Sequence, residues 1–72
     1  MSEIEPFAVV ALLKDHPEHG LVRGQVGTVV EALSPSMVEV EFSDDNGVTY
    51  ALLSLRSDEL IRLHHSPWEE VA

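Results

Sequence analysis

A strict alternation of apolar and polar residues runs through the middle of the chain. Val38, Val40 and Phe42 occupy one set of alternate positions, and Glu39 and Glu41 lie between them. Because successive side chains of a strand point to opposite faces of a sheet, the pattern predicts a strand with one buried face and one acidic, exposed face.

Four further segments are short, apolar and rich in β-branched residues, which predicts strands rather than helices. They are 7–13, 25–33, 48–53 and 60–63. Since no segment has a sustained helical period, a helix packed on a sheet is disfavoured. At 57–59, a serine and an aspartate are expected to cap a single helical turn by accepting hydrogen bonds from free backbone N–H groups.

The first of these segments, 7–13, is apolar at every position. Its odd-numbered residues point to one face of the predicted strand and its even-numbered residues to the other. Either both faces are covered, or one of them meets a partner. In so small a domain, two apolar faces indicate a surface that the chain does not fully cover. We take Val10 and Leu12 as candidate partner-binding residues.

Glycine, proline and asparagine mark the connections between these segments. The long connection 14–24 is expected to be anchored on the core by Leu21 and Val22. Gly27, inside a predicted strand, indicates a bulge or a tight bend. The segment 43–47 ends in asparagine and glycine, which tolerate positive φ, so a hairpin loop is expected there.

The order of these elements predicts an all-β fold, a five-stranded SH3-like small barrel with one short helical turn before the last strand. Near-closure of the sheet would remove most of its free edges. We place the barrel at 6–64, between an N-terminal extension at 1–5 and an acidic C-terminal tail at 65–72.

Two resemblances support this fold. The segment 21–31 resembles the glycine–valine signature of KOW-type SH3-like domains, in which spaced glycines shape the strand entry and valines pack inward. Most of the chain is similar to a bacterial family of short SH3-like proteins known only as a domain of unknown function. The segments that carry this second resemblance are 9–13, 21–31, 39–42, 44–47 and 50–53. It implies a bacterial, often mobile-element setting and a protein partner from a two-gene module, but no activity.

Charge narrows the range of partners. The chain has 13 acidic residues and four lysine or arginine residues, a net charge of −9 with histidines neutral. Phosphate backbones are bound by lysine and arginine, so this field repels nucleic acid and favours a basic protein partner. An acidic surface is also common in small proteins without such a partner. The KOW-type resemblance keeps a nucleic-acid-binding domain as the alternative, although RNA readers use basic grooves and exposed aromatic residues.

The absence of cysteine excludes disulfides and thiolate zinc sites, and it fits a cytoplasmic protein. The first residues lack the basic and apolar regions of a signal peptide. No apolar stretch approaches the roughly 20 residues that cross a bilayer. We therefore expect a soluble, cytoplasmic protein without a membrane segment.

The acidic residues are better explained by binding or by turn structure than by catalysis. Glu39 and Glu41 would lie about 7 Å apart on one strand face. A solvated face cannot separate the pKa values of a catalytic pair. Asp44 and Asp45 begin a loop that lacks the spaced acids of a calcium site, and a hairpin turn fits it better.

The histidines also lack a site around them. His16 and His19 are spaced as in some metal sites, but zinc needs a third ligand and none converges in the sequence. Surface histidines are the simpler interpretation. No nucleophile motif or phosphate-binding loop is present. We therefore expect no enzymatic activity, no metal and no cofactor.

The sequence thus predicts a non-enzymatic protein-interaction module, such as the acidic, neutralising member of a small bacterial two-gene module. Its partner would be a basic protein or a second copy of the chain. Tryptophan is favoured at interface centres, so the one in the tail could anchor on the barrel or on a partner. The candidate partner-binding residues are Val10, Leu12, Glu39, Glu41, Asp44, Asp45 and Trp68.

Overall fold

The strand predicted from the central alternation is present, and its valine face forms the middle of the core. In a computed structural model that describes residues 4–64, Val38, Val40 and Phe42 are at most 1% exposed. Glu39 and Glu41 between them are partly exposed. Hydrophobic alternation therefore decides which face of this strand is buried.

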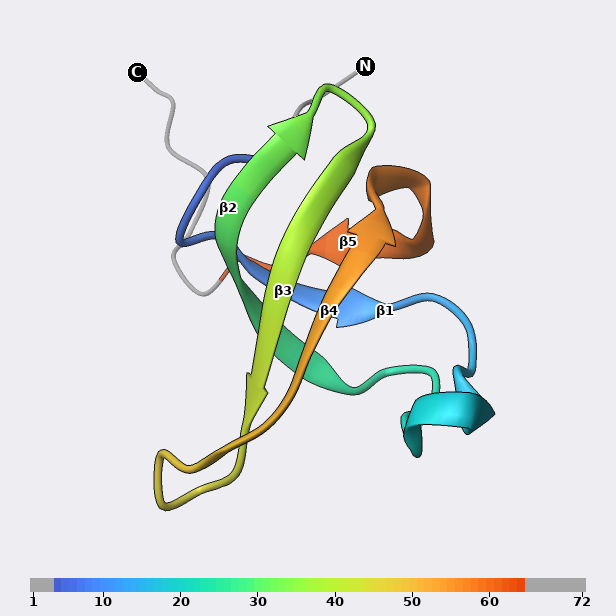
Figure 1. Ribbon diagram of the computed structural model, residues 1–72, viewed down its shortest axis with the longest axis vertical. Helices are drawn as coiled ribbons and strands as arrows, with labels where there is room; N and C mark the ends of the chain where they lie inside the picture. The colour runs from blue at the N-terminus through green and yellow to red at the C-terminus, as the bar shows by residue number, and fades with distance from the viewer. Residues whose placement is uncertain (1–3, 65–72) are drawn as a thin grey trace.

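Five strands and two single 3-10 turns make up the described chain (Figure 1). In chain order they are β1 Val9–Leu12, η1 Pro17–His19, β2 Val26–Ser34, β3 Met37–Ser43, β4 Thr49–Arg56, η2 Ser57–Glu59 and β5 Leu60–Arg62. Within residues 4–64 no α-helix occurs, and no helix is long and apolar enough to cross a membrane. The predicted all-β class, the number of strands and the turn before the last strand are confirmed.

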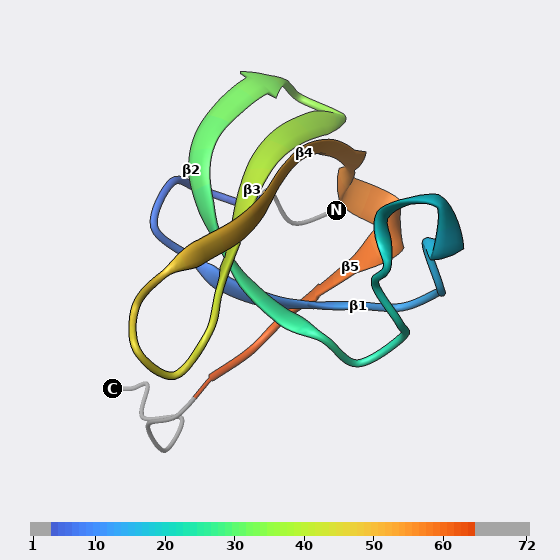
Figure 2. The same ribbon diagram turned by 60° about the horizontal axis from the view of Figure 1, so that its bottom comes forward.

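The strands form one antiparallel sheet in the order β4-β3-β2-β1-β5. β4 and β5 are its two edges and do not pair with each other, so the sheet is not closed. Figures 1 and 2 show β2 curving from β1 to β3, so that β1 and β5 cross behind β3 and β4. The core lies between these two parts of the folded sheet and takes side chains from all five strands.

At Gly27, β2 approaches β3 closely. A Cβ atom placed on it would lie 2.7 Å from Val40 Cγ1 and 2.9 Å from both Glu41 O and Phe42 Cε2. Gly27 pairs in regular register with Val10, and the irregularities of β2 occur further along the strand. The glycine is therefore needed for close packing between strands and not for a bulge.

The face of β1 that carries Val10 and Leu12 is the core face, so the prediction that these two residues bind a partner is wrong. Each is 1% exposed. The curl of the sheet turns the even-numbered residues of β1 inward, against β3 and β4. On the other face Ala11 is 7% exposed and Val9 is partly exposed.

The long β1–β2 connection is anchored by a buried leucine and a buried histidine. Leu21 is 1% exposed, as predicted, whereas Val22 is 60% exposed. His16 is 9% exposed and exchanges two backbone hydrogen bonds with Leu21, of 2.8 and 3.1 Å. The expectation of a surface histidine at position 16 is therefore wrong, because the connection folds back over the end of the sheet.

The turn η2 forms as predicted, but its side chains do not cap it. The Arg56 guanidinium holds Asp58 through hydrogen bonds of 2.6 and 3.1 Å. The Ser57 N–H donates to the backbone oxygen of Ser36 over 2.9 Å. A contact with the β2–β3 turn thus replaces the expected cap.

Gly27→Ala tests the close approach in the middle of the sheet. The added methyl group meets a backbone oxygen as well as two core side chains, so we expect a loss of about 1–3 kcal/mol in the free energy of unfolding. The exposed Ser54→Ala in β4 is the control and should change it by less than about 0.5 kcal/mol. Urea unfolding measures both, and equal stability of the two variants would show that the strands are not packed this closely.

Candidate functional site

The outward glutamates of β2 and β3 form an acidic face, which we define as Glu31, Glu39 and Glu41. In an antiparallel sheet, directly opposed residues point to the same face. Glu41 pairs with Thr28 on one side and with Leu52 on the other, while Glu39 pairs with Glu31 and with Ser54. Val38, Val40 and Phe42, which alternate with Glu39 and Glu41 on β3, are buried. Glu39, Glu41 and the residues paired with them therefore lie on the outer face of the sheet. Glu39 and Glu41 are thus placed as predicted.

Within this face two carboxylates oppose each other directly. Glu31 of β2 is the register partner of Glu39 of β3. Opposed residues have Cβ atoms about 4.5–5.5 Å apart, and like charges at this spacing destabilise a sheet. The pair is therefore a cost to the fold.

The cations of the described chain do not relieve this repulsion. Lys14, Arg56 and Arg62 pair with Glu59, Asp58 and Glu5, at 3.7, 2.6 and 3.1 Å respectively. None of the ion pairs formed within residues 4–64 includes a member of the acidic face. The hydroxyl of Thr49 donates a hydrogen bond to the Glu41 carboxylate. No ion pair within residues 4–64 therefore neutralises the acidic face.

The perturbed titrating groups lie elsewhere and are exposed. Hydrogen bonding to Arg56 lowers the pKa of Asp58, and the same contact raises the pKa of Arg56. A hydrogen bond from the backbone lowers the pKa of Glu18 in η1. These are solvated surface contacts, which contribute little to stability, and they do not resemble the buried pair of a general acid and base.

Beside the acidic face runs the free edge strand β4. It is eight residues long, contains no proline or lysine, and has one charged residue, Arg56, at its end. Leu52 on its outer face is 54% exposed. Natural edge strands are commonly shortened, charged or interrupted, and β5 at the opposite edge has three residues. The β4 edge, which is long and carries a charge only at its end, is therefore able to accept another strand.

Of the two aspartates in the β3–β4 loop, Asp44 stabilises the hairpin turn and Asp45 does not. Asp44 Oδ1 accepts hydrogen bonds from the N–H groups of Asn46, at 2.9 Å, and Val48, at 3.0 Å. Gly47 takes the positive φ of 81°, whereas Asn46 does not. Asp45 is exposed and makes no side-chain hydrogen bond within residues 4–64. The predicted hairpin loop is confirmed.

An ionisable cluster around the buried His16 joins the β1–β2 connection to η2. His16 Nε2 lies 3.3 Å from Glu59 Oε1, and His16 Nδ1 lies 3.8 Å from Glu18 Oε2. Lys14 approaches the other Glu59 oxygen. In the described part of the chain, no group of three or more histidine, cysteine, aspartate or glutamate side chains could hold a metal ion. The cluster therefore links the β1–β2 connection to the turn before β5.

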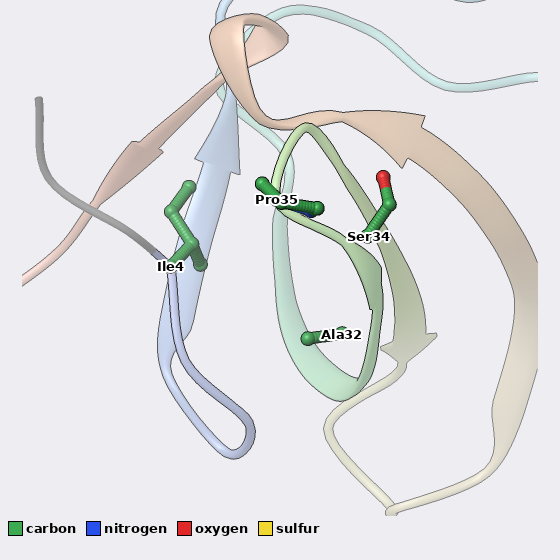
Figure 3. Close-up of a pocket in the computed structure, with 4 residues that line it drawn as sticks. All are labelled: Ile4, Ala32, Ser34 and Pro35. Atoms are coloured by element: carbon green, nitrogen blue, oxygen red, sulfur yellow. The ribbon is translucent and has the colours of Figure 1, made fainter.

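A hollow of about 220 Å³ lies between the N-terminal segment and the β2–β3 turn. It is lined by Ile4, Ala32, Ser34 and Pro35 (Figure 3). Ligand pockets are larger as a rule and present several convergent polar groups. Here the Ser34 hydroxyl is the one polar side-chain group of the lining, so the hollow offers neither an acid–base pair nor an activated nucleophile.

The sequence did not predict that Glu31 belongs to the acidic face or that Leu52 lies exposed beside it on β4. The register of β2 shifts between Val29 and Glu31, and the opposition of Glu31 to Glu39 depends on that shift. Simple alternation cannot reveal it. Of the remaining predicted site residues, Trp68 lies outside the described residues.

Fold and surface together define a small all-β domain with an acidic outer face and a free edge strand. The chain belongs to the DUF4926 family, a domain of unknown function, whose family model matches residues 7–62. The resemblance to a family of unknown function is thereby confirmed. No curated protein and no solved structure matches the chain.

The loop aspartates generate a paired prediction. Asp44→Ala removes the acceptor of two backbone N–H groups and should lower the free energy of unfolding by about 1 kcal/mol. Asp45→Ala should change it by less than about 0.5 kcal/mol. Urea unfolding of both variants checks this, and a larger loss for Asp45→Ala would contradict the assignment.

Proposed function

We propose that this protein is a non-enzymatic interaction module that binds a basic segment of another protein on its acidic face. The observation that carries the proposal is the direct opposition of Glu31 and Glu39 without a cation among the described residues. A lysine or arginine of a partner placed between the two carboxylates would turn a repulsive pair into an attractive group.

The geometry favours an extended partner segment along β4. An added strand would lie about 4.8 Å from β4 and about twice that from β3. Ser54 separates Glu39 from the edge and is small. A long lysine or arginine side chain from the added strand can pass over it to the acidic face. Leu52 would meet an apolar residue of the same segment, so the expected partner alternates basic and apolar residues.

The more specific setting is part of the same proposal. An SH3-like barrel is supported by the order of elements along the chain, and a bacterial two-gene module by the resemblance described above. A cytoplasmic location is supported by the lack of cysteine. The basic partner would then be the second product of the module, neutralised by this chain.

A peptide of the length of β4, with alternating lysine and valine, is the probe that tests this proposal. Fluorescence anisotropy should show binding that weakens with salt. The double variant Glu31→Gln/Glu39→Gln should weaken binding about tenfold, which corresponds to about 1.4 kcal/mol. The control variant Glu5→Gln/Glu18→Gln removes the same charge elsewhere and should leave the affinity within about twofold, since long-range effects are screened.

Two outcomes of the peptide experiments contradict the proposal. One is equal binding of the parent and the Glu31→Gln/Glu39→Gln variant. The other is equal binding of a glutamate–valine peptide. Generic RNA serves as the competing ligand at about 50 mM salt, where phosphate contacts are strong. A shift of RNA by the parent protein, with no binding of the basic peptide, would favour a nucleic-acid-binding domain instead.

A further inference from the structure

The outer face of the sheet has a second, apolar half over β5, β1 and the start of β2. Ala11 of β1 pairs with Ile61 of β5 on one side and with Val26 of β2 on the other. Val9 lies two residues away on the same face of β1, and its oxygen accepts a 2.9 Å hydrogen bond from the Leu63 N–H. We call these five residues the apolar face.

This face is exposed in the described structure. Ile61 is 49% exposed, Val26 48% and Leu63 37%, while the short side chain of Ala11 between the first two is 7% exposed. A contiguous exposed apolar surface is a candidate to be covered by another segment. The face is separate from the acidic face and from the partner site proposed above.

We propose that the C-terminal segment 65–72 of the same chain covers the apolar face, with Trp68 packed over Ala11 between Ile61 and Val26. The described chain ends at His64, directly after Leu63 of the face itself. Trp68 follows four residues later, which gives a reach of up to about 14 Å. Ile61 lies three residues, about 10 Å, back along β5 from His64, and Ala11 lies one strand, about 4.8 Å, to the side of it, so the tryptophan can reach Ala11.

Charge complementarity supports a path of the segment from β5 toward β2. Arg23 lies three residues before Val26, at the β2 end of the row, and forms no ion pair within residues 4–64. Glu69 and Glu70 directly follow the tryptophan. A segment that crosses from β5 toward β2 brings these two carboxylates to the guanidinium that the described chain leaves without a carboxylate partner.

A second copy of the chain fits the face less well. Specific protein–protein interfaces use about 20–30 residues on each side, far more than the five of the apolar face. Each copy also carries a net charge of −9, which opposes association. A tethered segment has an effective concentration in the millimolar range, so a small contact is sufficient for it.

The chain contains a single tryptophan, so its fluorescence reports on this contact alone. In the full chain, Trp68 should emit at shorter wavelength than in a free peptide of residues 64–72, with a severalfold smaller acrylamide quenching constant. Ile61→Ser should raise that constant toward the peptide value. Leu52→Ser, at a residue of similar exposure on β4, is the matched control and should leave it unchanged. Circular dichroism establishes that both variants are folded.

Three results would overturn the proposal. A parent protein as easily quenched as the free peptide would show that the segment does not pack on the domain. Protection that disappears on dilution would assign the face to a second copy. Protection lost as fully in Leu52→Ser as in Ile61→Ser would place the tryptophan elsewhere. Protection that is independent of concentration and lost selectively with Ile61→Ser supports the proposal.

Discussion

The close approach of β2 to β3 at Gly27 is the constraint on which the rest of the structure depends. Without a side chain at this position, β2 can pair with β1 over one part of its length and with β3 over the next. The two parts then fold over one core that includes Val10, Val40 and Phe42. The same continuity puts an apolar and an acidic surface side by side on the outside of one small sheet.

On the outer surface, the arrangement that we propose for binding differs from the one that would best stabilise the fold. Glu31 opposes Glu39, while the lysine and arginine side chains that form ion pairs are engaged by Glu5, Asp58 and Glu59. A sheet optimised for stability alone would place opposite charges across the two strands. Sequences that break a local rule without compensation do so most often at functional sites. The long free edge of β4 beside this pair is consistent with the proposed binding of an extended basic segment.

Much of the fold follows from patterns that are local in the sequence, whereas the site depends on register. Alternation in β3 identified its core face and its acidic face together, because only its even-numbered residues, Val38, Val40 and Phe42, can face the core. In β1 both the odd-numbered and the even-numbered residues are apolar, so the sequence alone could not show that Val10 faces inward. The partnership of Glu31 with Glu39 depends on a register shift in β2. Burial of His16 depends on a connection that folds back, and neither feature has a periodic signal.

A double-mutant cycle on Glu31 and Glu39 tests most directly whether the acidic face is maintained at the expense of stability. Urea unfolding of Glu31→Gln, Glu39→Gln and the double variant gives the coupling free energy, from which general charge effects cancel. Each single variant should be more stable than the parent by about 0.2–1 kcal/mol, and the double variant should gain little more than one single variant. Strictly additive effects, or a loss of stability in both single variants, would contradict a repulsive pair at this position.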